Sequence, residues 1–192
     1  MRICAILLVA GFSLLPAQAD ALVTVVGPTL AHDCFLIAKA GNNPVGGINT
    51  CDEALHEESL DPHQRAGTYV NRAVMKVALN RVDDAMRDYD QALALTPDLG
   101  DGYVDRGAAL IILKRYDEAI ADINKGMGLG LSYEHVGYYN RGVVEFYMGR
   151  ITESYYDYKK ALEIDPDFQP AAQQLKNFVV TRVPAKTPTE PH

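Results

Sequence analysis

The amino-acid sequence predicts an all-α protein, a right-handed solenoid of helical hairpins. Two observations support this prediction. A pattern of tyrosine, arginine and small residues returns three times: Tyr69 and Tyr103 are 34 positions apart, and Tyr103 and Tyr138 are 35 apart. Within each period, two stretches of about 14 residues carry apolar or small residues at helical spacing. Units of this kind cannot bury their apolar faces alone and are stabilised by stacking on their neighbours.

Each repeat is predicted to hold two antiparallel helices. Small side chains recur on the first helix, at Ala73, Gly107 and Gly142, and on the second helix, at Ala85, Ala119 and Ser154. Turns between the two helices are predicted at Asn80-Arg81, Lys114-Arg115 and Gly149-Arg150. Pro97 and Pro166 end two of the units, because proline lacks the N–H that a continuing helix needs.

Residues 66–168 resemble the tetratricopeptide-repeat (TPR) family, whose helix–turn–helix units have about 34 residues. The resemblance implies three clear units, at 66–99, 100–134 and 135–168. An arginine replaces the leucine expected before the small residue of each first helix. The unit at 100–134 has glycines at 126, 128 and 130 in place of a closing proline, so we expect its second helix to end early or to fray.

A degenerate TPR unit is predicted at 31–64. His32–Ala40 has helical character, Gly41–Pro44 predicts a turn, and Ile48–Leu55 repeats the pattern of the second helices. The linker that follows, His56–Gln64, is expected to be longer than the other linkers.

This unit contains two cysteines, Cys34 and Cys51, which are 17 positions apart. Arg72 and Tyr89 have the same spacing and lie level with each other across the next predicted hairpin. We therefore predict a structural disulfide that stabilises the terminal unit by on the order of 3 kcal/mol. Without residues 1–19, which contain Cys4, two cysteines remain. An even number in an exported chain favours the bridge, with two buried free thiols as the alternative.

Residues 1–19 have the form of a signal peptide. Arg2 precedes an apolar run at Ile3–Leu15, and Ala17-Gln18-Ala19 matches a signal-peptidase site. We expect cleavage after Ala19 and a periplasmic or secreted location. The apolar run is shorter than the roughly 20 residues of a membrane-spanning helix, so no stable membrane insertion is expected.

The segments that flank the repeats are predicted to differ from them. Residues 20–30 form an N-terminal arm, 169–181 a capping helix and 182–192 a disordered tail. The apolar stripe of the capping helix consists of Leu175, Phe178 and Val179. Such a helix covers the last core face of a solenoid.

Composition and motifs exclude several functions. The formal net charge of −7 disfavours nucleic-acid binding and docking on anionic lipid. The neighbours His32, Asp33 and Cys34 point in different directions on a helix and cannot form a catalytic triad. No histidine and cysteine set has the spacing of a metal site, and the glycines near 128 lack the lysine of a phosphate loop. We expect no catalytic residues, metal or cofactor.

The arginines Arg72, Arg106 and Arg141 have two interpretations. They pair with aspartates on the second helices and tie each hairpin together, or they form a row of cations for an acidic ligand. The first is favoured, because arginine–carboxylate geometry is good and three aspartates recur in step: Asp88, Asp122 and Asp157.

In TPR proteins the first helices line the concave face, which binds a protein or peptide partner. The helical period places a mostly apolar row there, with an asparagine or aspartate at one recurring level. The row consists of Val70, Asn71, Val74, Val77, Val104, Asp105, Ala108, Ile111, Tyr139, Asn140, Val143 and Phe146. Co-chaperone TPRs bind a terminal carboxylate there through lysines, whereas Asp101 and Asp105 would repel that ligand.

These observations predict an exported, non-catalytic interaction module or scaffold. Two alternatives remain open. One is a self-assembling structural protein of the cell envelope, and the other is an enzyme whose site carries no recognised motif.

Overall fold

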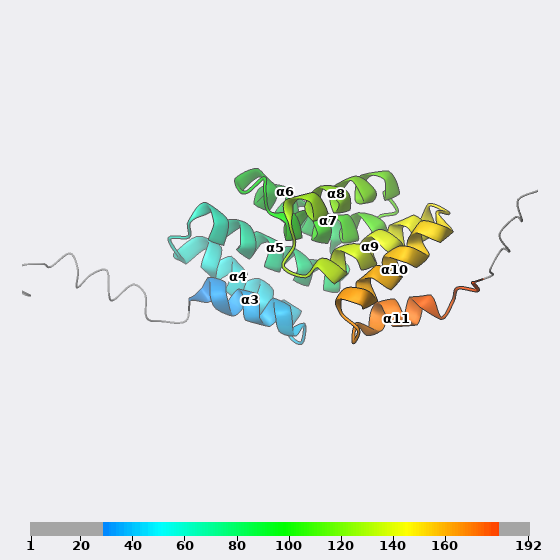
Figure 1. The fold of residues 1–192 in the computed structure, drawn as a ribbon. Coiled ribbons are helices and arrows are strands. Elements are labelled where there is room, and N and C mark those ends of the chain that lie inside the picture. The colour runs from blue at the N-terminus through cyan, green and yellow to red at the C-terminus, as the bar shows by residue number, and fades with distance from the viewer. Residues whose placement is uncertain (1–28, 181–192) are drawn as a thin grey trace, which may run out of the picture.

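The computed structural model describes residues 29–180, which form nine helices and no strand, as predicted for an all-α solenoid (Figure 1). The predicted signal peptide, most of the N-terminal arm and the C-terminal tail lie outside these residues. The helices are α3 (Leu30–Ala40), α4 (Pro44–Glu57), α5 (Pro62–Ala78), α6 (Val82–Leu95), α7 (Gly100–Ile112), α8 (Tyr116–Leu129), α9 (Glu134–Tyr147), α10 (Ile151–Ile164) and α11 (Gln169–Leu175).

Four hairpins follow one another along the solenoid: α3–α4, α5–α6, α7–α8 and α9–α10 (Figure 1). The first helices also contact each other across the hairpins, in the pairs α3 with α5, α5 with α7 and α7 with α9. No comparable contact joins the second helices to one another within residues 29–180. The first helices are therefore the inner layer of a curved array, and the second helices are its outer layer.

The turns within the hairpins lie where they were predicted. Asn80 and Lys114 both have φ of 59°, and Gly149 has φ of 77°, a left-handed conformation that ends the first helix and lets the chain reverse. Gly41 takes the same role in the N-terminal hairpin, with φ of 65°.

Small residues on the first helices face large buried residues on the second. A Cβ added to Gly107 would lie 2.6 Å from Ile123 Cγ1, and one added to Gly142 would lie 3.0 Å from the Tyr158 ring. Ile123 and Tyr158 are almost fully buried. The recurring small residues are thus required by close packing between the two helices of each hairpin.

The predicted linker His56–Gln64 is wrong at both ends. Helix α4 continues to Glu57, and α5 begins at Pro62. The start of α5 is fixed by a capping box, in which Gln64 N donates to Asp61 Oδ1 (2.8 Å) and Asp61 N donates to Gln64 Oε1 (3.1 Å).

The expectation that the glycines of α8 end this helix early is also wrong. The helix reaches Leu129 and has 14 residues, the same length as α6 and α10. Gly126 is needed inside the helix, because its Cβ would lie 2.5 Å from Gly100 O at the start of α7. Gly100 and Gly126 permit a close crossing of α7 and α8, and the helix continues through its glycines.

Helix α11 is shorter than the predicted capping helix and ends at Leu175. Leu175 and Phe178 pack against the buried cluster of Tyr158, Ala161 and Ala171, as expected for a cap. Val179, which was predicted to belong to the apolar stripe, lies beyond the helix and is exposed.

Candidate functional site

Arg72, Arg106 and Arg141 each form a bidentate ion pair across their own hairpin, which confirms the interpretation favoured from the sequence. In each pair, Nε and Nη2 of the arginine donate to the two carboxylate oxygens over 2.6–2.9 Å. The pairs are Arg72 with Asp88, Arg106 with Asp122 and Arg141 with Asp157.

The same arginines reach back to the preceding hairpin. Nη1 of Arg72 donates to Asp52, Nη1 of Arg106 donates to Asp90, and Nη1 of Arg141 donates to Asn124. Each guanidinium also lies 5.2–5.5 Å from the ring centre of the tyrosine three positions earlier. We call the arginines and their aspartate partners on the second helices the Arg–Asp ladder. Its guanidinium groups are occupied within the chain, so they do not form a free row of cations.

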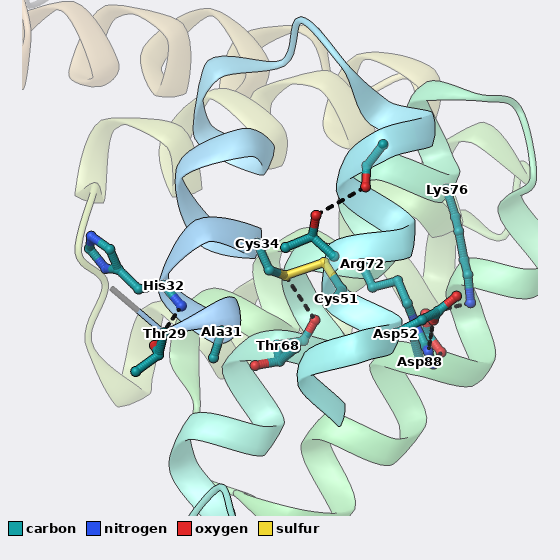
Figure 2. The surroundings of a disulfide bond; sticks show 12 residues. Thr29, Ala31, His32, Cys34, Cys51, Asp52, Thr68, Arg72, Lys76 and Asp88 are labelled. Carbon is teal, nitrogen blue, oxygen red and sulfur yellow. Dashed lines mark hydrogen bonds and ion pairs between the residues drawn. A yellow bond between two sulfur atoms is a disulfide. The ribbon is translucent and has the colours of Figure 1, made fainter. Parts of the chain in front are cut away.

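The N-terminal hairpin lacks a rung of this ladder. Cys34 on α3 takes the position of the arginine, Cys51 on α4 takes that of Tyr89, and Thr50 takes that of Asp88. Figure 2 shows the disulfide between α3 and α4. The two sulfur atoms are 2.14 Å apart, and both cysteines are fully buried. The Arg72 rung lies on the adjacent hairpin (Figure 2).

A groove of about 310 Å³ lies along the inner layer, over α5 and α7. Its walls combine segments that are far apart in sequence, with Phe35 of α3 and Tyr133 before α9 as exposed aromatic residues. The remaining lining residues are Gly67, Val70, Asn71, Leu99, Asp101, Gly102, Val104, Asp105, Leu131, Ser132 and Val136. The groove is mainly apolar, and it contains two carboxylates.

The structure brings four residues of the predicted concave row into this groove: Val70, Asn71, Val104 and Asp105. Five others pack against the buried clusters between helices: Val74, Val77, Ile111, Tyr139 and Val143. Ala108 and Asn140 are half-buried outside the groove, and Phe146 is exposed and lies against Phe178.

Two groove residues that the predicted row omitted, Gly67 and Val136, lie about one turn nearer the start of their first helices. They share that level with Asp101, which the sequence had already placed on the concave face. The repeat register was sufficient to find this level. The contributions of Phe35 and of the segment Leu131–Tyr133 depend on contacts between distant units, which no local pattern reports.

The two carboxylates of the groove, Asp101 and Asp105, are one turn apart on α7. Asp101 accepts hydrogen bonds from Ser132 N (3.1 Å) and Ser132 Oγ (2.6 Å). Burial of Asp105, together with the negative charge of Asp101, raises the pKa of Asp105 to about 7. Among the residues that the structure describes, no lysine, arginine or histidine lines the groove.

A second hollow of about 390 Å³ lies between α6, α7 and α8. It is larger, but its charged side chains already pair with each other. Arg106 binds Asp90 and Asp122, and Arg115 binds Glu118. The inner groove is therefore the better candidate for a binding site.

The chemical candidates from the sequence do not converge. Cys34 is bonded to Cys51, and His32, two positions before Cys34 on α3, is exposed. His56 Nδ1 lies 2.9 Å from the carbonyl oxygen of Asp52. Within residues 29–180, no group of three histidine, cysteine or acidic residues is arranged to hold a metal ion. In the same part of the chain, no helix has both the length and the apolar character needed to cross a bilayer.

Comparison with known proteins assigns the repeat formed by α9 and α10. The family model described as tetratricopeptide repeat matches residues 135–168. These residues are a tetratricopeptide repeat, and the chain as a whole shares the fold of solved TPR domains. Curated protein sequences gave no significant match.

Three solved structures illustrate the similarity in fold. PilW, described as a widely conserved type IV pilus biogenesis factor, has a TM-score of 0.67 and 22% identity over 76% of this chain and 65% of its own. PilF of Pseudomonas aeruginosa has a TM-score of 0.65 and 20% identity over 76% and 64%. The first TPR domain of RPAP3, solved with an HSP90 peptide, has a TM-score of 0.55 and 24% identity over 59% and 90%.

Proposed function

We propose that this TPR protein is an exported, non-catalytic scaffold that binds an extended segment of a partner protein in its inner groove. The observation that carries the proposal is the groove itself, in which apolar side chains of several hairpins converge on one concave surface. Such a surface takes alternate side chains of an extended peptide into pockets, and polar groups between them bind its backbone.

The peptide bound by a protein of the same fold supports a peptide ligand, and the charges of this groove limit its chemistry. The first TPR domain of RPAP3 was solved with a peptide that ends in Glu-Glu-Val-Asp. In this chain the groove carries Asp101 and Asp105, and no lysine or arginine of residues 29–180 lines it. Like charges would repel an acidic peptide end, so the proposed partner belongs to another chemical class.

Export is supported by residues 1–19 and by the cysteines. A disulfide persists in an oxidising compartment such as the bacterial periplasm and is rare in the cytosol. The fully buried pair Cys34 and Cys51 fits that compartment. The similarity in fold to the pilus biogenesis factor PilW is consistent with a role in the cell envelope.

Self-assembly through an uncovered end is the less favoured function. The last hairpin is covered by α11, with Phe168, Leu175 and Phe178 packed on its core. A terminal cap of this kind limits stacking of one solenoid on the next.

Site-specific photocrosslinking in the native compartment tests the proposal. A photoreactive phenylalanine analogue would replace Tyr133 at the groove or Tyr156 on α10, which are matched in residue type and in exposure (56% and 61%). We expect a discrete adduct with another protein from position 133 and none from position 156. Equal adducts from both positions, or adducts only between copies of this chain, would contradict binding in the groove.

A further inference from the structure

The carboxylates of the groove differ from the aspartates that lie beside the ladder arginines. Asp52, Asp88, Asp90, Asp122 and Asp157 each bind an arginine or a lysine within the chain. Asp105 accepts no hydrogen bond and forms no ion pair among the described residues, and Asp101 is bound only by the neutral Ser132. The first helix of the second clear repeat therefore places uncompensated negative charge in the groove.

This arrangement is unfavourable in the free protein. Two carboxylates four positions apart on a helix repel each other. Asp105 is also partly buried beside Val70 and Val104, where the charged form is poorly solvated. A cation from outside the chain would remove both penalties, because it would neutralise the pair and satisfy the free oxygens of Asp105.

The walls of the groove favour a cation that is attached to an apolar stem. Phe35 and Tyr133 present exposed aromatic rings, which attract lysine and arginine as well as aliphatic carbon. A volume of about 310 Å³ is at the small end for ligand sites and holds a few side chains. These features match one long basic side chain with apolar neighbours.

We propose that the groove recognises a lysine or arginine side chain within an extended, otherwise apolar segment of the partner protein, with Asp101 and Asp105 as its counter-charges. This inference rests on the proposed function and specifies the chemistry of the ligand. Ser132 holds the Asp101 carboxylate in place. Asp105 has no such partner, so its protonation and its hydrogen bonding change most on binding.

Binding of a cation should depend on pH. Below pH 7 Asp105 is mostly protonated, and it must lose its proton to form the ion pair. Its titratable neighbours in the groove are Asp101 on α7 and Tyr133 before α9, and Tyr89 on α6 lies behind it. None of these is a cation, so affinity should rise between pH 6 and pH 8.

The experiment uses the purified chain without residues 1–19 and a displayed library of random nine-residue peptides. We expect the selected peptides to contain a lysine or arginine flanked by apolar residues. A selected peptide is then compared with a copy in which norleucine replaces its lysine, against the unmodified protein and the Asp105→Asn variant. Asp167→Asn, an exposed aspartate after α10, is the matched control.

The expected result is a coupled effect. Asp105→Asn should weaken binding at pH 8 at least tenfold and abolish the rise between pH 6 and pH 8. The norleucine peptide should bind the unmodified protein at least tenfold more weakly and should be indifferent to Asp105→Asn. Asp167→Asn should leave the dissociation constant unchanged.

Three results would overturn the inference. If the selected peptides crosslink at position 133 but contain no lysine or arginine, the groove binds peptides without recognising a cation. Independent effects of norleucine and Asp105→Asn would show that the two groups do not meet. Failure to select any peptide that crosslinks at position 133 would overturn both the inference and the proposed function.

Discussion

The N-terminal hairpin and the three hairpins after it join their two helices through different chemistry. In the later hairpins, an arginine of the first helix forms a bidentate ion pair with an aspartate of the second, and also reaches the preceding hairpin. In the N-terminal hairpin, Cys34 takes the arginine position and bonds to Cys51.

The difference follows from position in the array. Each arginine of the Arg–Asp ladder gains a further hydrogen bond from the hairpin before it, because Nη1 donates to the preceding second helix. The first hairpin of the described chain has no earlier hairpin to supply that partner. A covalent bond requires no neighbour, and it limits the unfolded chain directly. Terminal repeats have fewer interfaces, so a local crosslink stabilises them where stacking cannot.

Among the changes that test this comparison, removal of the disulfide should have the largest effect on stability. The double variant Cys34→Ala and Cys51→Ala should lower the free energy of unfolding by about 3 kcal/mol, as expected for a closed loop of 17 residues. Hydrogen exchange should accelerate in α3 and α4 and stay unchanged in α9 and α10. Titration of free thiols in the unmodified protein provides the control. Uniform acceleration over all helices would show that the crosslink does not act locally.

Loss of one rung should have the next largest effect. Arg106→Met removes a partly buried arginine and leaves Asp122 without its partner, so we expect a loss of about 2 kcal/mol in chemical denaturation. The control is Arg115→Met, which removes an exposed ion pair with Glu118 and should give no measurable change. An equal loss of stability in both variants would show that the Arg106–Asp122 pair contributes no more than an exposed surface ion pair.

The sequence predicted the parts of this architecture that repeat. Residues that face each other across a hairpin recur at a fixed spacing, and this register is sufficient to identify both the Arg–Asp rungs and the cysteine pair. Helix ends were predicted less well. The capping box of Asp61 and Gln64 has a recognisable sequence pattern. The continuation of α8 through its glycines depends on contact with Gly100, which is distant in the chain.

The groove was predicted only in part for a related reason. Helical periodicity selects one face of each first helix, but the neighbouring units decide which residues of that face stay open. Val74 and Val143 were on the predicted face and pack into the core, whereas Tyr133 was not and lines the groove. The open part of a concave surface is a property of the assembled solenoid, and one repeat does not contain it.

The three hairpins of the Arg–Asp ladder differ in the residue one turn after the arginine. It is Lys76 in one hairpin, which also binds Asp88, then Leu110, and then Glu145. Glu145 is buried, and its Oε2 has no hydrogen-bond partner within residues 29–180. Burial and the nearby charge of Asp157 raise the pKa of Glu145 to about 7.

A carboxyl group whose pKa is higher in the folded than in the unfolded state favours folding at low pH. That contribution is complete below the ordinary pKa of glutamate, near 4.5, and is lost as pH rises to about 7. Glu145→Gln should therefore stabilise the protein by about 1–2 kcal/mol at pH 8 and by much less at pH 4.5. Asp105 titrates in the same range, so the difference between the variant and the unmodified protein is the quantity to measure. A difference that does not change with pH would contradict titration of Glu145.

The smallest effect is expected where the two kinds of hairpin join. Asp61 caps α5, the helix that connects the disulfide-bonded hairpin to the ladder, and Asp61→Ala should cost about 1 kcal/mol through the loss of the capping box. Asp98→Ala is the matched control, because Asp98 is an exposed aspartate just before α7, whose start has no side-chain cap. Hydrogen exchange should accelerate in the first turn of α5 and stay unchanged at the start of α7. If Asp61→Ala also accelerated exchange throughout α3 and α4, the N-terminal hairpin would depend on its junction with α5 more than on its own crosslink.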